Sequence, residues 1–472
     1  MNNMKAHGLP TDFTTRMQEE LGEDFKLLEA ALQEKPPVSI RYNPLKKTQP
    51  ENDLPPVPWS RHGFYLPTRP DFYKDPLIFA GAYYVQEASS MFIDRIIQGI
   101  TTPSQPLKIL DLCAAPGGKS TLIATAMPEG SLLVSNEIVA KRAIPLAENL
   151  MRWGNENVLV SNNNPQDFEI LREFFDVILV DAPCSGEGMF RKDPKVAGLW
   201  NKNTPMACAQ RQEQILESVD KMLKPGGHLI YSTCTFAKEE NEDQITRLVQ
   251  EENYKALPVT INPEWQVTEI NSETTSGQSI YAYRFYPHKT QGEGFFAACL
   301  QKGGEDYGNR RIKLPKKLAK SQQDFKMLPK KYLSEIESWI NEPSNFAFIL
   351  EGELVYALPR NYFSEIKLLS KVLRVKLKGV ELGKLKNNKF IPAHPLAMSR
   401  ILHPKIPSLD LDYEQAVHYL KKQEVVAETK LKGWAITAYQ KVPLGWCKVL
   451  PNRINNYYPS ELRIRKDFEV VG

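Results

Sequence analysis

The feature that most constrains the fold is an alternation of apolar strand patterns and helical patterns between residues 107 and 250. The predicted strands cover 107–113, 131–136, 158–160, 175–180 and 228–233, and the predicted helices cover 118–126, 139–153, 205–223 and 238–250. Such alternation is typical of parallel strands joined by crossover helices. We therefore expect an α/β protein with a doubly wound, mainly parallel sheet, in which ligands bind outside the carboxyl ends of the strands.

The segments on either side of this region have different patterns. A helical pattern up to residue 32 and a strand pattern at 38–43 predict a small N-terminal module. A polar break at 303–311 precedes basic, helix-like segments, and 433–450 alternates in the manner of β-strands. We predict four domains: 1–100, an N-terminal RNA-binding or capping module; 101–302, the catalytic domain; 303–385, a basic helical connecting domain; and 386–472, a β-rich domain.

Charge is distributed unevenly along the chain. Residues 1–300 carry a formal net charge of −9, and residues 301–472 carry +13. Lysine and arginine cluster at 310–320 and 371–389, where they can hold phosphate groups. The asymmetry favours one part that performs a reaction and another that grips a polyanion, over a lysine-rich surface that is merely solvated.

Composition excludes several other classes of protein. No apolar run approaches the ~18–20 residues that a membrane helix needs, and residues 1–7 lack the apolar core of a signal peptide. The six cysteines are too sparse for a disulfide scaffold, and no two are spaced as Cys-x-x-Cys, so no metal site is expected. These observations predict a cytoplasmic protein with free thiols and no membrane contact.

The turn after the first predicted strand has the composition of a ligand-binding loop. It consists of Cys113-Ala114-Ala115-Pro116-Gly117-Gly118-Lys119-Ser120 and leads into a helix. Small residues let a ligand approach the backbone, and a helix N-terminus attracts negative charge. A P-loop is disfavoured because Cys113 stands where its first glycine belongs and Pro116 has no amide proton. A loop that holds the amino-acid end of S-adenosylmethionine, with Glu137 on the ribose hydroxyls, fits better.

Two cysteines follow neighbouring strands of the predicted sheet. Cys184 lies in Asp181-Ala182-Pro183-Cys184-Ser185-Gly186, and Cys234 lies in Tyr231-Ser232-Thr233-Cys234-Thr235. Neighbouring strand ends open on one crevice, so we expect both thiols to face the same substrate. A thiol beside a methyl donor suits carbon methylation of a pyrimidine, because a thiolate that adds to C6 of cytosine makes C5 nucleophilic. Asp181 is placed to assist at N3 of the ring.

In order and spacing these motifs resemble the Sun/nucleolar-protein family of RNA cytosine-5 methyltransferases. Segments 382–397 and 443–459 further resemble its bacterial ribosomal RsmF branch, which carries a PUA-like RNA-binding domain. The resemblance implies a Rossmann-like methyltransferase sheet with S-adenosylmethionine as cofactor. It also implies a PUA-like terminal domain and ribosomal RNA, favouring the small ribosomal subunit, as partner.

The resemblance also implies which residues carry the reaction. Cys234 is the nucleophile, Cys184 assists release of the enzyme from its product, and Asp181 contacts the cytosine ring. DNA cytosine-5 methyltransferases instead use the cysteine of a Pro-Cys motif, which nominates Cys184. The additional Thr-Cys is the feature of the RNA family that favours Cys234.

The same resemblance implies the residues that surround the cofactor. They are Cys113 to Lys119, Glu137 and Asp181. The family has an acid after the third strand, near the adenine, where this chain has Ser161-Asn162-Asn163-Asn164-Pro165. We expect Asn164 to make that contact.

Three alternative functions stay open from the sequence. The first is the same chemistry on transfer RNA, and the second is a P-loop ATPase. The third is a non-catalytic RNA-binding or ribosome-assembly protein, for which replacement of Cys234 leaves function intact.

Overall fold

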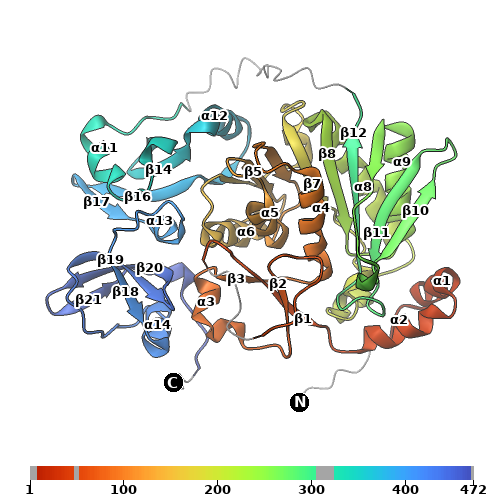
Figure 1. Cartoon of the computed structure of the whole chain (residues 1–472), viewed down its shortest axis with the longest axis horizontal. Coiled ribbons are helices and arrows are strands. Elements are labelled where there is room, and N and C mark those ends of the chain that lie inside the picture. Colours follow the sequence, from red (N-terminus) through yellow and green to blue (C-terminus); the bar gives the residue numbers. More distant parts are fainter. Residues whose placement is uncertain (1–7, 47–52, 305–323, 469–472) are drawn as a thin grey trace.

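The computed structural model describes residues 8–46, 53–304 and 324–468, and one ten-stranded sheet forms its centre (Figure 1). The strands of this sheet are β4 (Lys108–Asp111), β5 (Leu132–Asn136), β6 (Val158–Ser161), β7 (Phe175–Asp181), β8 (Leu223–Thr233), β9 (Tyr254–Leu257), β10 (Thr268–Glu273), β11 (Ser279–Phe285), β12 (Phe295–Lys302) and β15 (Val375–Lys378). Their order is β10-β11-β12-β8-β7-β4-β5-β6-β15, and β9 pairs with β12. Strands β4 to β8 are mutually parallel, so the predicted doubly wound sheet is confirmed.

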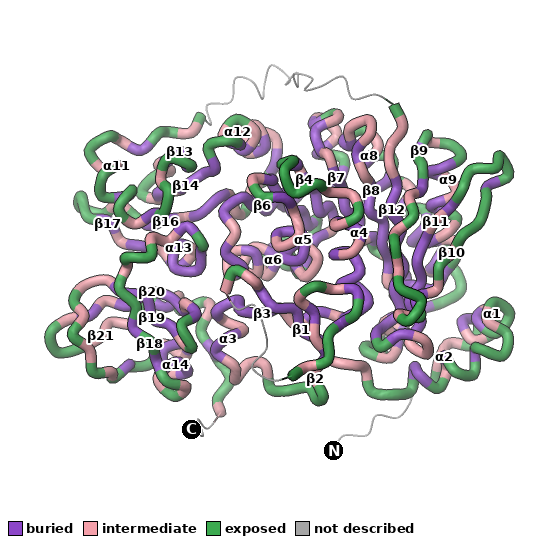
Figure 2. The backbone as a smooth tube through the Cα atoms, viewed as in Figure 1, coloured by how far each residue is buried: buried purple, intermediate pink, exposed green. Residues whose placement is uncertain are grey.

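Helices cover both faces of this sheet, so its central strands are buried on both sides. The helices of this region are α4 (Phe92–Ile100), α5 (Gly118–Ala126), α6 (Ala140–Trp153), α7 (Pro194–Leu199), α8 (Thr204–Met222), α9 (Glu242–Glu251) and α12 (Phe363–Val372). Successive residues of β4 point to opposite faces: Ile109 belongs to the core with α4, α5 and α6, and Leu110 to the core with α8, α9 and α12. Figure 2 shows the resulting band of buried backbone along the central strands.

The N-terminal module begins with two helices, α1 and α2, where the sequence predicted one helix up to residue 32. Its elements are α1 (Thr11–Leu21), α2 (Asp24–Gln33), β1 (Val38–Tyr42), β2 (Gly63–Leu66), α3 (Pro76–Phe79) and β3 (Tyr83–Val85), with sheet order β2-β1-β3. The predicted helix breaks at Gly22, whose φ of 57° is left-handed. A glycine takes this conformation without the steric penalty of a side chain, so the apolar spacing continues while the helix does not.

The C-terminal third holds two more four-stranded sheets. Its remaining elements are α11 (Lys330–Glu337), β13 (Phe346–Glu351), β14 (Leu354–Pro359), β16 (Val380–Lys386), β17 (Lys389–Pro392), α13 (His394–Met398), β18 (Ser408–Leu411), α14 (Tyr413–Leu420), β19 (Gly433–Tyr439), β20 (Val442–Leu450) and β21 (Arg453–Asn456). The sheets have the orders β13-β14-β16-β17 and β18-β19-β20-β21. Strands β19 and β20 coincide with the β pattern predicted at 433–450.

The segment expected to be a helical connection, 303–385, is only partly helical. It contributes α11 and α12, but also β13 and β14, and β15 extends the central sheet by pairing antiparallel to β6. The missed hairpin turns at Gly352, which has a φ of 60° and separates two apolar runs. The basic cluster at 310–320 lies outside the described residues.

The sheet of the N-terminal module and helix α3 pack against the last sheet of the chain. Apolar residues of the N-terminal module and of the last sheet share one core, and Figure 1 places α3 beside α14 and β20. Ile40 and Tyr83 from the first module are buried there with Leu444 and Cys447 from β20. No helix in the described part of the chain combines the length and apolar character that crossing a membrane requires.

Candidate active site

A cavity of about 480 Å³ opens at the carboxyl ends of the central parallel strands. This is where a doubly wound sheet binds its ligands, because the order of the strands reverses at β4. The lining residues are Leu112, Cys113, Ala115, Asn136, Glu137, Ile138, Arg142, Pro165, Gln166, Asp181, Ala182, Pro183, Cys184, Arg211, Gln214, Ile215 and Cys234. The cavity thus brings together Glu137, Asp181 and both predicted cysteines with part of the loop after β4. Of the loop residues predicted to surround the cofactor, Cys113 and Ala115 line the cavity, whereas Ala114, Pro116, Gly117, Gly118 and Lys119 are not among its lining residues.

The loop after β4 is held from both sides. Gly117 has a φ of 111°, which only glycine adopts readily, and it turns the chain into α5. Behind the loop, the guanidinium of the buried Arg41 donates to Thr121 Oγ1 at 2.6 Å and to the Gly118 carbonyl at 3.3 Å. The amide of Ala114 donates to the carbonyl of Asn136 at 2.8 Å. These contacts fix the loop and the start of α5.

Glu137 occupies one end of the cavity as a buried carboxylate. Its Oε1 accepts from the amide of Val139 at 2.8 Å, and its Oε2 lies 3.5 Å from Nη1 of Arg142. Arg142 also donates to the carbonyl of Ala115 at 2.9 Å, which ties this end of the cavity to the loop. Arg142 could not be predicted from the sequence, since a single arginine in the first turn of a helix is common on protein surfaces.

Asp181 lies at the end of β7 with both carboxylate oxygens engaged. Oδ2 accepts from Nζ of Lys119 at 2.7 Å, and Oδ1 accepts from Oγ of Ser232 at 2.9 Å. Burial opposes the charge of Lys119, but the ion pair and hydrogen bond with Asp181 outweigh it, so the pKa of Lys119 is raised. The predicted loop lysine therefore faces Asp181, and together they form a fixed charge pair at the cavity.

The two cysteine sulfurs are in direct contact. Sγ of Cys184 lies 3.3 Å from Sγ of Cys234, and it also accepts from the amide of Cys234 at 3.4 Å. The hydrogen bond to Cys234 together with burial raises the pKa of the Cys184 thiol well above its ordinary value. The raised pKa favours the protonated form of Cys184, and either sulfur can be the donor in the contact between the two.

Behind Cys184, a buried polar network that the sequence analysis missed fixes its loop. Glu240 accepts from the amide of Ser185 at 3.0 Å and from Gln212 at 2.9 Å, and Ser185 Oγ lies 2.7 Å from Thr235 Oγ1. Burial raises the pKa of Glu240 to about 7, although the bonds from Ser185 and Gln212 lower it. Glu240 gave no signal because it belongs to a run of acidic residues that is typical of a solvated helix start.

A second buried carboxylate, Glu187, joins both cysteine loops to the N-terminal module. Its Oε2 accepts from Arg16 of α1 at 2.6 Å and from the amide of Phe236 at 3.2 Å, and its Oε1 accepts from the indole of Trp200 at 3.1 Å. Glu187 follows Cys184 by three residues, and Phe236 follows Cys234 by two. One carboxylate therefore sets the spacing of the two loops.

Asn164 lies outside this arrangement. It is exposed before a short helical turn, and its amide donates to Oδ2 of Asp167 at 3.1 Å. Its neighbours Pro165 and Gln166 line the cavity instead. These two lining groups are a proline ring and a neutral amide, neither of which carries charge.

Comparison with known proteins matches this architecture segment by segment. Family models match at residues 100–301 (16S rRNA methyltransferase RsmB/F), 9–88 (N-terminal domain of 16S rRNA methyltransferase RsmF), 331–399 (RsmF rRNA methyltransferase first C-terminal domain) and 406–464 (methyltransferase RsmF PUA domain).

Relatives of similar length match nearly the whole chain. A ribosomal RNA small subunit methyltransferase F from Aliivibrio fischeri is 31% identical, over 96% of this chain and 97% of its own. Its namesake from Vibrio vulnificus is 30% identical, over 87% of this chain and 85% of its own.

Solved structures match the central part of the fold. A methyltransferase homologue from Pyrococcus horikoshii, 28% identical, superposes with a TM-score of 0.53 over 62% of this chain and 96% of its own. NSun6 from the same organism, solved with the S-adenosylmethionine analogue SFG, has a TM-score of 0.52 at 21% identity, over 63% of this chain and 99% of its own.

The fold and the site thus define a methyltransferase with a Rossmann-like sheet, an N-terminal module and a C-terminal PUA domain. More particularly, the chain belongs to the RsmF family of ribosomal RNA methyltransferases, within the Sun family. Its cofactor is S-adenosylmethionine.

The residues of the cavity suit this cofactor. The buried carboxylate of Glu137 is an acceptor for a pair of hydroxyls, and Ile138, Ala182 and Ile215 provide apolar walls. Arg142, which also lines the cavity, is a cation that suits a carboxylate. The donor and acceptor set therefore fits a nucleoside that carries an amino-acid group.

Proposed function

We propose that this protein methylates C5 of a cytosine in ribosomal RNA of the small subunit, through a covalent bond between Cys234 and C6 of the base. The observation that carries the proposal is the contact between the two sulfurs, 3.3 Å apart on the wall of a cavity that also holds Asp181 and Glu137. Pyrimidine C5 needs such a nucleophile, because it does not attack an electrophilic methyl group unaided. S-adenosylmethionine supplies that methyl group when it is bound.

The position of each residue indicates its role in the proposed reaction. The thiolate of Cys234 adds to C6, and the electron pair of the C5–C6 double bond moves toward C5, which takes up the methyl group. Asp181, held by Lys119 and Ser232, is the group that we place against the N3 edge of the ring. Its carboxylate accepts there from the proton that N3 takes up from solvent during addition and gives back when the S–C6 bond breaks. A base then removes the C5 proton, the S–C6 bond breaks, and its electron pair returns to the sulfur of Cys234.

Cys184 acts in the release step under this proposal. Its sulfur lies 3.3 Å from the sulfur of Cys234, so it is placed to stabilise that sulfur as the bond to C6 breaks. The target cytosine has to leave any stack that it occupies to reach the two sulfurs.

We propose that the other parts of the chain bind the RNA. The division into an N-terminal module, a catalytic domain and two C-terminal domains is supported by the separate sheets and by the segments that the family models match. We place the boundary between the two C-terminal domains near residue 400 rather than 385, because this keeps the sheet β13-β14-β16-β17 within one domain. A ribosomal RNA substrate places the protein in the cytoplasm.

The test is methyl transfer to RNA from cells that lack this protein. The purified enzyme and S-adenosylmethionine with a deuterated methyl group are incubated separately with small-subunit RNA, assembled small subunits and transfer RNA, and the nucleosides are identified by mass spectrometry. We expect labelled 5-methylcytidine in the ribosomal RNA samples. The proposal is contradicted if the label appears only in transfer RNA or on another atom. It is also contradicted if no label appears although the enzyme forms a complex with the RNA.

A further inference from the structure

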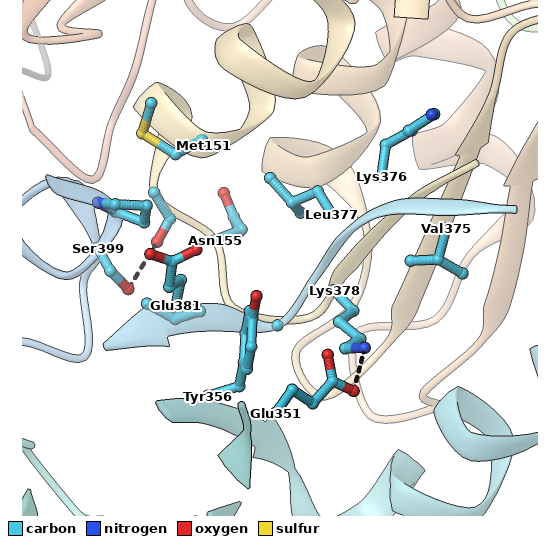
Figure 3. Close-up of a pocket in the computed structure, with 14 residues that line it drawn as sticks. Met151, Asn155, Glu351, Tyr356, Val375, Lys376, Leu377, Lys378, Glu381 and Ser399 are labelled. Atoms are coloured by element: carbon cyan, nitrogen blue, oxygen red, sulfur yellow. Dashed lines mark hydrogen bonds and ion pairs between the residues drawn. The ribbon is translucent and has the colours of Figure 1, made fainter. Parts of the chain in front are cut away.

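A second cavity, of about 220 Å³, lies between the edge of the central sheet and the sheet β13-β14-β16-β17 (Figure 3). It is far larger than the ~30 Å³ that one water molecule occupies in the liquid. Met151 of α6 and Leu377 of β15 lie on one side, and Tyr356 of β14 and Glu381 of β16 lie on the other. Tyr356 and Glu381 are paired across neighbouring strands, so their side chains emerge on the same face of their sheet.

Glu381 is unusual in its surroundings. Residues 371–389 contain seven lysines and arginines, and Glu381 is the one acidic residue among them. Its carboxylate makes no hydrogen bond or ion pair with any of the described residues, and burial raises its pKa, opposed only by the charge of Lys384. By contrast Glu351, the other carboxylate at this cavity, is paired with Lys378 at 2.6 Å.

A second acceptor at this cavity also lacks a hydrogen-bond donor. Oδ1 of Asn155 is buried with no hydrogen-bond partner among the described residues. A half-buried carboxylate and a buried amide oxygen both call for hydrogen-bond donors. The cavity therefore suits a ligand that presents hydrogen-bond donors to these oxygens.

The position of the cavity relates it to the active site. Strand β15 begins beside the first cavity, where the amide and Nε of Arg374 donate to Asn163 and Asn162 at 2.8 and 2.9 Å. Its following residues, Lys376 and Leu377, line the second cavity. At ~3.3 Å per residue, Arg374 and Leu377 are roughly 10 Å apart, a distance that a few nucleotides span. Arg374 and Lys376 are both exposed along this path.

We propose that this cavity binds an unpaired guanine of the substrate RNA, with its Watson–Crick edge donating to Glu381. Guanine N1–H and N2–H together match the two oxygens of one carboxylate, whereas adenine and cytosine each offer only an amino group at that edge. Lys376 and the neighbouring basic residues are placed to receive phosphates. The same positive charge disfavours the other donor-rich occupant, an arginine side chain of a protein. The inference rests on the proposed function, because it takes RNA as the substrate.

The test measures binding of fluorescent uridine hexanucleotides that carry one guanosine, inosine or adenosine at the centre. They contain no cytosine, so they do not present the target base of the active site. We expect the full-length protein to bind the guanosine oligonucleotide at least about fivefold more tightly than the other two, the lower bound for one bidentate base contact. Inosine differs from guanosine only in lacking the N2 amino group, so the comparison of the two measures the contribution of that group to binding.

Two matched variants assign the preference to the cavity. Glu381→Gln keeps the shape of the side chain and should abolish the preference for guanosine. Glu353→Gln removes an exposed carboxylate from the turn of the same sheet and should leave it unchanged. Equal binding of the three oligonucleotides, or a guanosine preference that survives in Glu381→Gln, overturns the inference. It is also overturned if pentaarginine displaces the guanosine oligonucleotide from the wild-type protein and this displacement requires Glu381.

Methyl transfer by the same wild-type preparation separates the two proposals. Transfer to unmodified ribosomal RNA without a guanosine preference overturns only the guanine site. Absence of transfer to any RNA overturns the proposed function, whichever oligonucleotide binds best.

Discussion

At the scale of single residues, the site depends on charge pairs and thiols that burial keeps in fixed positions. Lys119 and Asp181 form a pair at 2.7 Å beside the cavity, and Ser232 completes the set of partners of Asp181. The sequence predicted Asp181 and both cysteines, because all three end strands of a recognisable sheet. It placed Lys119 among the residues around the cofactor, and its contact with Asp181 became visible only in the folded structure.

Replacement of Lys119 tests this pair. In Lys119→Met, Asp181 loses its cationic partner, and we expect the rate of methyl transfer to fall by about 100-fold, the lower end of what a positioned proton-handling group contributes. Lys221→Met removes a more exposed lysine, paired with Glu169, and serves as the control. Single-turnover kinetics with ribosomal RNA measure both variants, and a Lys119→Met rate within twofold of wild type contradicts the assignment.

Glu240 predicts a pH dependence of stability. Its pKa of about 7 in the folded protein exceeds the ordinary 4.5, so the folded state holds a proton that the unfolded state releases between these values. The contribution of this carboxyl is therefore present below pH 4.5 and is lost as the pH rises to about 7, by up to about 3 kcal/mol.

Urea denaturation at several pH values measures this effect. Wild type should lose stability relative to Glu240→Gln between pH 4.5 and 7, because glutamine does not titrate. A difference between the two proteins that stays constant over this range would show that Glu240 does not titrate as described.

At the scale of elements, helix α1 is tied to the catalytic loops by one ion pair. Arg16 of α1 contacts Glu187, which is fully buried and also holds the loop after Cys234. The amphipathic pattern of α1 predicted a helix with a buried face, but nothing in its sequence indicated where that face docks. Long-range contacts of this kind depend on the tertiary arrangement and leave no local signal.

Removal of the cation leaves a buried charge without its partner. We expect Arg16→Met to lower the free energy of unfolding by about 2 kcal/mol, less than the ~3–5 kcal/mol of a fully buried pair because Arg16 is partly exposed. Methyl transfer should fall as well, since Glu187 spaces the cysteine loops. Lys26→Met breaks an exposed pair with Glu23 in α2 and should change stability by less than about 0.5 kcal/mol. Equal effects of the two substitutions in urea denaturation are incompatible with this role.

At the scale of the whole molecule, the first and last modules share a core. Ile40 and Tyr83 pack with residues of the final sheet, including Leu444, so the two modules are expected to stabilise each other. Truncation after Lys405 should expose the segment 77–83 and raise its amide exchange by at least about tenfold, while the strands β4 and β7 stay protected. Hydrogen exchange with mass spectrometry reads both regions, and unchanged exchange at 77–83 is the result that excludes this coupling.

The sequence predicted the central sheet well and its edges poorly. Strands β4 to β7 fall within a residue or two of the predicted runs, because apolar strands alternate there with long helices. Strand β15 was missed: its lysines alternate with Val375 and Leu377, and only pairing with β6 makes it part of the sheet. The cavity beside Glu381 likewise exists only after two sheets meet.

The most direct test of the account is the bond between the enzyme and the base. Cys184→Ala and Cys234→Ala are each incubated with unmodified ribosomal RNA and S-adenosylmethionine, separated on a denaturing gel, and mapped by peptide mass spectrometry. We expect Cys184→Ala to accumulate a protein–RNA adduct at Cys234, because release is impaired, and Cys234→Ala to form none. An adduct at Cys184 in Cys234→Ala, or full turnover by that variant, contradicts the central claim.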